Sequence, residues 1–295
     1  MDDLAYSLKT MTARVADGSH ATRANRHRGL QAMAVELKTL GYRLPGATSL
    51  KPKHVDALVK HWKAEGINDR SIRNRLGWAR WWAEQINKPG LLPASNEAFG
   101  LAERTPYQGN RARKADVDTL ARVADQRIRL ALKLEAAFGL RREEALKFRP
   151  KVSDHGDHLA LVPSTTKGGR YREIPLTDPR QRALLDEVHT LAGDGSLIPA
   201  GTTYREYLNR YKHQTRAAGL GNAHGLRHGY AQWRYARLTG WKAPAAGGPT
   251  IERMTPEQVR LDRAARLQIS RELGHNRLDI ADTYLGRAKA TKAAA

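Results

Sequence analysis

The sequence predicts a mainly α-helical protein with one small β-hairpin, divided into two domains. Apolar residues recur at intervals of three and four through the first hundred residues, which is the spacing of one helix face. That spacing is lost between Leu91 and Lys114, where prolines, a glycine and clustered basic residues are typical of a linker. A chain of 295 residues has room for two cores. We therefore expect a helical domain over residues 1–92, a basic linker over 93–115 and a second domain over 116–295.

Three helices are predicted in the first domain. The first carries apolar residues from Leu30 to Leu40 and ends at Gly41. The second begins at about Pro52 and ends at Gly66, and the third begins at Asp69 or Ser71. Together these helices are typical of a small helical bundle.

The third helix interleaves arginines with tryptophans. We expect the tryptophans to lie in the core, because indoles bring the largest apolar area to a small bundle. The arginines either follow a phosphate backbone or form a solvated face, and both readings stay open. They are Arg70, Arg73, Arg75 and Arg80.

The second domain begins with helical sequence at about Asp116. The stretch from Ile128 to Leu140 is apolar on most faces, which is typical of a helix at the centre of a core. Residues 159–162 and 171–176 have the composition of strands, and we expect a hairpin whose tip carries Lys167. Further helices are predicted near 178–192, 203–218, 224–238, 256–273 and 278–285, and Thr255 followed by Pro256 marks one helix start.

The charge balance indicates a polyanionic partner. The chain has 51 Lys and Arg against 30 Asp and Glu, a formal net charge of +21. Such a surplus favours nucleic acid, with an unspecific basic surface as the alternative. The absence of cysteine excludes disulfides and cysteine nucleophiles. The acidic start of the chain and the lack of a long apolar run predict neither a signal peptide nor a membrane span, so we expect a cytoplasmic protein.

Four short motifs occur in order in the second domain, and Tyr284 lies nine residues after the histidine of the last one. A tyrosine nucleophile, fixed guanidinium groups and a lysine acid are sufficient to attack a phosphodiester without a metal. The sequence therefore predicts DNA strand chemistry. The motifs are Gly139-Leu140-Arg141-Arg142-Glu143-Glu144, Thr166-Lys167-Gly168-Gly169, His224-Gly225-Leu226-Arg227 and Leu273-Gly274-His275.

This ordered set resembles the tyrosine recombinase, or phage integrase, family, most strongly from Phe138 to Gly286. The resemblance implies a two-domain clamp around double-stranded DNA and site-specific recombination by a homotetramer on two DNA sites. It implies no cofactor, and it suggests a bacterial mobile element or phage, accessory DNA-bending proteins and association with the nucleoid. A type IB topoisomerase and a DNA-binding protein without catalysis are the alternatives.

The resemblance also assigns roles to single residues. Tyr284 matches the nucleophile, Arg141 and Arg227 match the phosphate clamps, and Lys167 matches the general acid. A guanidinium suits the clamp because it is always protonated and donates two parallel hydrogen bonds.

Two histidines and one acid complete the expected site. His224 matches a residue that helps to deprotonate the tyrosine, and His275 matches one that bonds the scissile phosphate. Glu144 matches an acid that braces the arginines. The histidines have no cysteine or close histidine partner, so no metal site is predicted. The motif register excludes His228 and Arg142, the neighbours of the matched residues.

Other basic residues are candidate DNA contacts. They are the four arginines of the third helix, the linker residues Arg111, Arg113 and Lys114, and Arg170 beside the hairpin tip. Residues 240–249 are rich in glycine, alanine and proline, and we interpret them as a loop insertion between Arg227 and His275.

Overall fold

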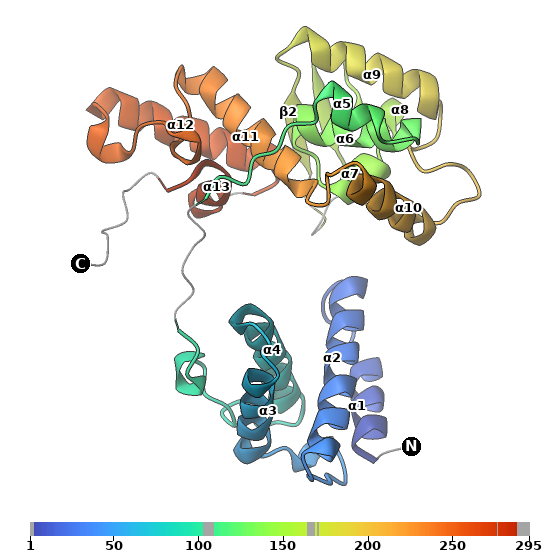
Figure 1. Ribbon diagram of the computed structural model, residues 1–295, viewed down its shortest axis with the longest axis vertical. Helices are drawn as coiled ribbons and strands as arrows, with labels where there is room; N and C mark the ends of the chain where they lie inside the picture. The colour runs from blue at the N-terminus through green and yellow to red at the C-terminus, as the bar shows by residue number, and fades with distance from the viewer. Residues whose placement is uncertain (1–2, 103–108, 164–168, 170, 276, 288–295) are drawn as a thin grey trace. The chain divides into compact units, whose positions relative to one another are not determined.

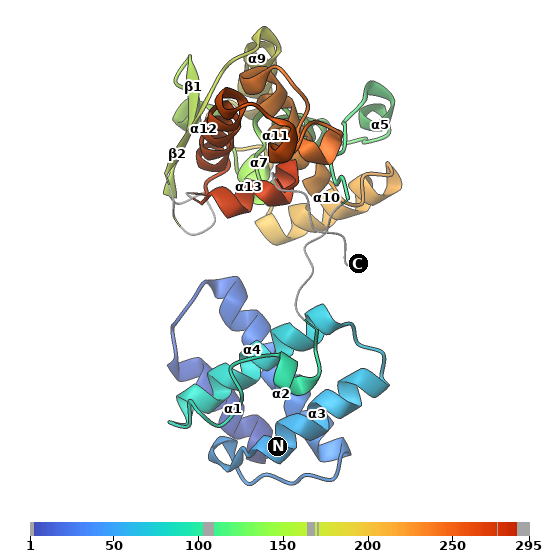
Figure 2. The ribbon, with the colours of Figure 1, turned by 90° about the vertical axis from the view of Figure 1, so that its left-hand side faces the viewer.

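A computed structural model describes residues 3–102, 109–163, 169, 171–275 and 277–287. The chain divides into two compact units, Met1–Thr105 and Pro106–Ala295 (Figures 1 and 2). Within the described ranges, no helix combines the length and the apolar character needed to cross a membrane.

The first unit is a bundle of helices around a tryptophan-rich core. Trp82 is fully buried, as predicted, and Trp78 and Trp81 pack partly buried against the same core. Trp62 is fully buried as well. The three predicted helices are confirmed, whereas the periodicity did not mark α1 as a separate element. The elements are α1 (Asp3–Arg14), α2 (His20–Thr39), η1 (Ala47–Ser49), α3 (Pro52–Ala64), α4 (Asp69–Gln85) and η2 (Glu97–Phe99).

The segment that follows α4 packs on the first unit, although a linker is expected from residue 93. Phe99 and Leu101 are buried in the core of this unit. The ammonium of Lys63 donates to the carbonyl oxygen of Phe99 at 2.8 Å, and Nε of Arg80 donates to that of Pro93 at 2.9 Å. These cations satisfy carbonyl groups that the irregular backbone leaves without ladder partners.

The second unit is mainly helical around α6. This helix packs against α7, α9 and α11, which accords with its apolar sequence. The elements are α5 (Val117–Ala121), α6 (Gln126–Phe138), α7 (Arg142–Leu146), α8 (Pro150–Ser153), β1 (His158–Leu161), β2 (Arg172–Pro175), α9 (Pro179–Ala192), α10 (Tyr204–Ala217), α11 (His224–Thr239), η4 (Pro244–Ala246), η5 (Ile251–Arg253), α12 (Pro256–Glu272) and α13 (Leu278–Leu285).

The predicted hairpin and helix caps are confirmed. β1 and β2 pair antiparallel, with Leu159 opposite Ile174. The hydroxyl of Thr255 accepts from the backbone N–H of Gln258, and Pro256 occupies the first turn of α12. The hairpin tip with Lys167, and Arg170 beside it, lie outside the described residues.

The predicted insertion is not an open loop. It contains the short turn η4, the turn η5 follows it, and Ala243 is fully buried. Ala245 lies so close to Gly286 that a Cβ on this glycine would meet the Ala245 backbone nitrogen at 2.7 Å. The insertion therefore packs on the end of α13, which carries Tyr284.

Replacing Gly139 with alanine should destabilise the second unit by about 2–4 kcal/mol. Gly139 has φ +63°, and a Cβ there would meet Tyr230 at 2.5 Å and Leu273 at 2.9 Å. Positive φ accounts for about 1 kcal/mol and overpacking for roughly 1–3 kcal/mol. Gly156→Ala is the matched control, because Gly156 also has positive φ but open space around it. Denaturant unfolding of both variants should show the larger loss for Gly139→Ala, and equal losses would contradict this packing.

Candidate active site

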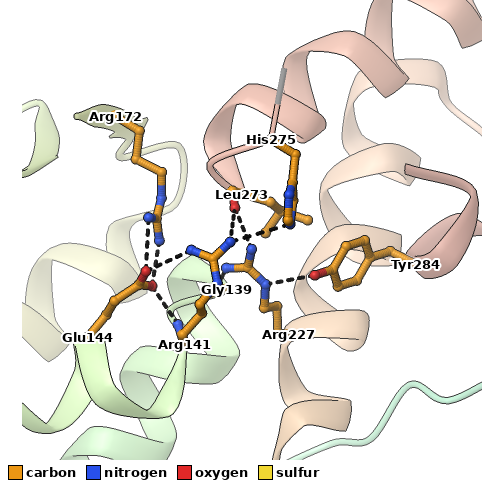
Figure 3. A network of polar contacts seen from close by, with 8 residues as sticks. All are labelled: Gly139, Arg141, Glu144, Arg172, Arg227, Leu273, His275 and Tyr284. Carbon is orange, nitrogen blue, oxygen red and sulfur yellow. Dashed lines mark hydrogen bonds and ion pairs between the residues drawn. The ribbon is translucent and has the colours of Figure 1, made fainter. Parts of the chain in front are cut away.

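The candidate site forms where several helices of the second unit begin or end (Figure 3). Arg141 is the N-cap residue of α7, and Arg227 lies in the first turn of α11. His275 follows the C-terminal end of α12, and Tyr284 belongs to α13. Four separate segments thus supply the side chains.

Glu144 is the anionic centre of the site. Its carboxylate, 2% exposed, accepts the backbone N–H and the Nη1 of Arg141, each at 2.7 Å. It also accepts the Nη1 of Arg172 at 3.0 Å and its Nη2 at 2.6 Å, so this second pair is bidentate. Burial opposes ionisation, but the bonds and the charge of Arg172, with the charge of Arg141, outweigh it and lower the pKa of Glu144 to about 2.

Two guanidinium groups meet at the carbonyl oxygen of Leu273. Arg227 donates to it through Nη2, and Arg141 donates through Nη2 at 3.2 Å. Leu273 caps the C-terminus of α12, where carbonyl groups without intrahelical partners carry partial negative charge. Arg227 also donates to the carbonyl oxygen of Gly139, the glycine at the end of α6. Helix ends thus help to hold two cations close together.

Arg227 and Tyr284 are in direct contact. The Nε of Arg227 donates to the hydroxyl oxygen of Tyr284 at 3.2 Å, and Figure 3 shows this hydroxyl directed at the guanidinium. Arg227 is 0% exposed and Tyr284 is 6% exposed. Burial lowers the pKa of Arg227 to about 10, so this group still carries its charge at neutral pH.

Three histidines surround the ring of Tyr284. The ring centroids of His224 and His275 each lie 6.2 Å from the tyrosine centroid, and that of His228 lies 4.7 Å away. Nε2 of His275 is 3.4 Å from Nη2 of Arg141. Partial removal from water, with the charges of Arg227 and Arg141, lowers the pKa of His224, which favours the neutral, proton-accepting form.

The structure brings together all of the predicted catalytic residues that it describes. These are Arg141, His224, Arg227, His275 and Tyr284, with Glu144 beside them. Among the described residues, no group of three or more histidines and carboxylates could hold a metal ion.

Two residues of the site were missed from sequence, and each had a signal. Arg172 lies on β2 two positions before buried Ile174, so strand alternation places both on the inner face. His228 follows His224 by four residues and therefore shares its face of α11. Motif register alone excluded His228.

The predicted DNA-contact residues fall into two groups. Arg70, Arg111, Arg113 and Lys114 are exposed. Arg73, Arg75 and Arg80 make contacts within the first unit, and Arg75, for example, donates to Glu36 at 2.9 Å. DNA contact by either group stays a prediction.

Two family models match this chain. The model described as "Phage integrase, N-terminal" matches residues 1–88, and the model described as "Integrase" matches residues 108–233. Together they span most of both units, whereas His275 and Tyr284 lie beyond the second match.

Individual relatives agree with the family models. The chain is 28% identical to tyrosine recombinase XerC of Methylobacterium nodulans over 219 residues, which cover 66% of this chain and 67% of the relative. A lambda integrase fragment crystallised as a dimer on a COC′ core site matches with a TM-score of 0.63 at 14% identity, covering 98% of both chains. A lambda integrase tetramer bound to a Holliday junction matches with a TM-score of 0.56 at 15% identity, covering 92% of this chain and 77% of the other.

Replacing Glu144 with glutamine should destabilise the second unit by roughly 3–5 kcal/mol at neutral pH, because it breaks a buried ion pair and leaves arginines uncompensated. The pKa of Glu144 is lowered from 4.5 to about 2, so its contribution is present above pH 4.5 and is lost as the pH falls toward 2. The difference in unfolding free energy between wild type and variant should therefore shrink over that range. Glu187→Gln is the control, since Glu187 forms an exposed pair. A difference that does not change with pH would contradict the assignment.

Proposed function

This chain belongs to the tyrosine recombinase, or phage integrase, family, and we propose that it recombines DNA at specific sites through a 3′-phosphotyrosyl intermediate. The observation that carries the proposal is the contact of Tyr284 with Arg227 beside Arg141 and the histidines. A nucleophile, two cations and proton-accepting imidazoles thus share one small volume.

The first step forms the bond between the Tyr284 oxygen and phosphorus and breaks the bond from phosphorus to the 5′ oxygen of the DNA. The phenol oxygen accepts from Arg227, so its own proton is directed to another acceptor. Neutral His224 is suited to receive that proton. The covalent phosphotyrosine keeps the bond energy, and rejoining therefore requires no ATP.

The negative charge of the transition state is met by arginine. Charge builds on the non-bridging phosphate oxygens as the tyrosine attacks, and prearranged guanidinium groups stabilise it without reorganisation. Arg141 is held by Glu144 and Arg227 by two backbone carbonyls, so both are oriented before DNA arrives. We assign these two residues to the clamp and Glu144 to the brace.

The leaving 5′ oxygen needs a proton. We assign this general-acid role to Lys167 from its place in the family motif. His275, through its contact with Arg141, is assigned to phosphate binding.

Tyr284 and Arg227 cover each other. The guanidinium is fully buried, and its Nε is already occupied by the tyrosine hydroxyl. A phosphodiester that contacts this nitrogen must take the place of the hydroxyl. DNA binding therefore has to shift α13 or the tyrosine side chain before attack.

Double-stranded DNA is the proposed partner. The formal charge of +21 and the exposed cluster of Arg111, Arg113 and Lys114 support it. By analogy with the lambda integrase tetramer on a Holliday junction, we propose four protomers on two sites. We expect the protein to work in the cytoplasm, at the nucleoid, in the service of a mobile element or phage.

Tyr284→Phe should bind DNA like wild type but form no covalent adduct. The hydroxyl is the nucleophile, whereas binding depends on many phosphate contacts. A nicked suicide substrate on a denaturing gel measures the adduct, and Tyr171→Phe, which changes an exposed tyrosine, is the control. A persistent adduct band in Tyr284→Phe would falsify the assignment. A two-duplex assay with wild type then separates recombination from relaxation of a single duplex.

Lys167→Ala should cleave ordinary DNA roughly 10²–10⁴-fold more slowly, as expected for a lost general acid. It should recover on DNA with sulfur at the 5′ bridging position, because a thiolate leaves without a proton. Arg141→Ala should stay slow on both substrates, since sulfur at the leaving position does not neutralise the non-bridging oxygens. Rescue of both variants, or of neither, would remove Lys167 from the acid role.

A further inference from the structure

His228 is the histidine whose ring lies nearest to that of Tyr284. The two centroids are 4.7 Å apart with planes tilted by 46°, a packing distance for aromatic rings. His228 is 3% exposed, and its ring also meets that of His224 edge-on at 5.5 Å. The His228 imidazole thus packs on the rings of His224 and Tyr284, which are both candidate catalytic residues.

Gln232 lies one turn further along α11, on the same face as His228. Its Nε2 donates to the backbone carbonyl oxygen of Tyr284 at 3.1 Å and to the side-chain oxygen of Asn110 at 2.9 Å. The Gln232 carboxamide therefore connects the backbone of Tyr284 to Asn110, which lies far away in the sequence. Both protons of the amide nitrogen are used.

The segment 110–113 runs directly over this part of α11. The backbone N–H of Arg113 donates to the carbonyl oxygen of Gly225 at 2.9 Å. A Cβ on Gly229 would meet the carbonyl oxygen of Arg113 at 2.6 Å, so only glycine leaves room for this crossing. Gln232 thereby connects this backbone segment to α13, and His228, one turn before it, packs on the ring of Tyr284.

An uncharged ring suits this position. Burial, with the charges of His224, Arg111 and Arg227, lowers the pKa of His228 to about 4. The side chain is therefore neutral at physiological pH and adds no charge to a site that already holds three arginines.

We propose that His228 and Gln232 are positioning residues for Tyr284, the first holding the plane of the phenol ring and the second holding the backbone of α13 against the segment 110–113. The reaction that they serve is the proposed strand cleavage, on which this inference rests. Gln232 also links the position of the segment 110–113 to the position of the nucleophile.

The test compares His228→Ala, His228→Phe and Gln232→Leu in the full-length protein. A displacement of the nucleophile on the order of 1 Å can slow a reaction by roughly 10²-fold. Adduct formation on prebound nicked DNA should therefore slow by roughly 10–100-fold in His228→Ala and by less in Gln232→Leu, with DNA affinity unchanged. His228→Phe keeps a neutral ring and should retain most of the rate.

A second readout does not depend on activity. Labelling the ten tyrosines with 3-fluorotyrosine gives a ¹⁹F spectrum in which the Tyr284 line is identified by its absence from Tyr284→Phe. That line should shift or broaden in His228→Ala and in Gln232→Leu, and stay close to wild type in His228→Phe. If wild type forms no adduct while the line responds in this way, the proposed function fails and the positioning role stands.

Leu184→Ala is the matched control for general destabilisation. Leu184 is buried on α9 in the core of the second unit, whereas His228 and Gln232 belong to α11 and Tyr284 to α13. Its truncation should lower the melting temperature but leave the Tyr284 line and the adduct rate near wild type below the transition. An unchanged line and rate in His228→Ala, or equal losses in Leu184→Ala, would overturn the proposal.

Discussion

The site depends on holding like charges together in a buried place. Arg141, Arg172 and Arg227 would repel one another if nothing negative lay between them, and repulsion is costly away from water. Glu144 binds two of them, and the carbonyl of Leu273 accepts from Arg141 and Arg227. The partial negative charge at the C-terminal end of α12 thus stabilises the arginines as a second anion would. A cluster prepared in this way can meet the charge of a transition state without moving.

The same cluster explains why Tyr284, the proposed nucleophile, is buried. The hydroxyl of Tyr284 occupies the Nε of Arg227, so the tyrosine satisfies a buried donor that a phosphate would otherwise satisfy. Around it, His228 and Gln232 fix the ring and the backbone. In the proposed reaction, a phosphate oxygen replaces the tyrosine hydroxyl as the acceptor of Arg227, and phosphate binding would therefore release the nucleophile.

Most helices and most candidate site residues could be predicted from the sequence. An apolar stretch predicted α6, a clear N-terminal cap predicted α12, and the order of the motifs singled out Arg141, Arg227 and Tyr284 as site candidates. Arg172 and His228 were missed because their roles arise from tertiary packing, which local motifs do not encode. The segment after residue 93 packs on the first unit and is not part of an extended linker, because Phe99 and Leu101 bury their side chains there. Prolines and glycines lie only a few residues away from both. The place of Lys167 stays a prediction, since it lies outside the described residues.

In the proposed reaction, Tyr284 is the residue that becomes joined to DNA. The most direct measurement is mass spectrometry of the covalent adduct, trapped on a nicked substrate and digested with protease and nuclease. We expect a nucleotide on the phenol oxygen of Tyr284, attached through the 3′ phosphate. Attachment to another of the ten tyrosines, or to another side chain, would contradict it.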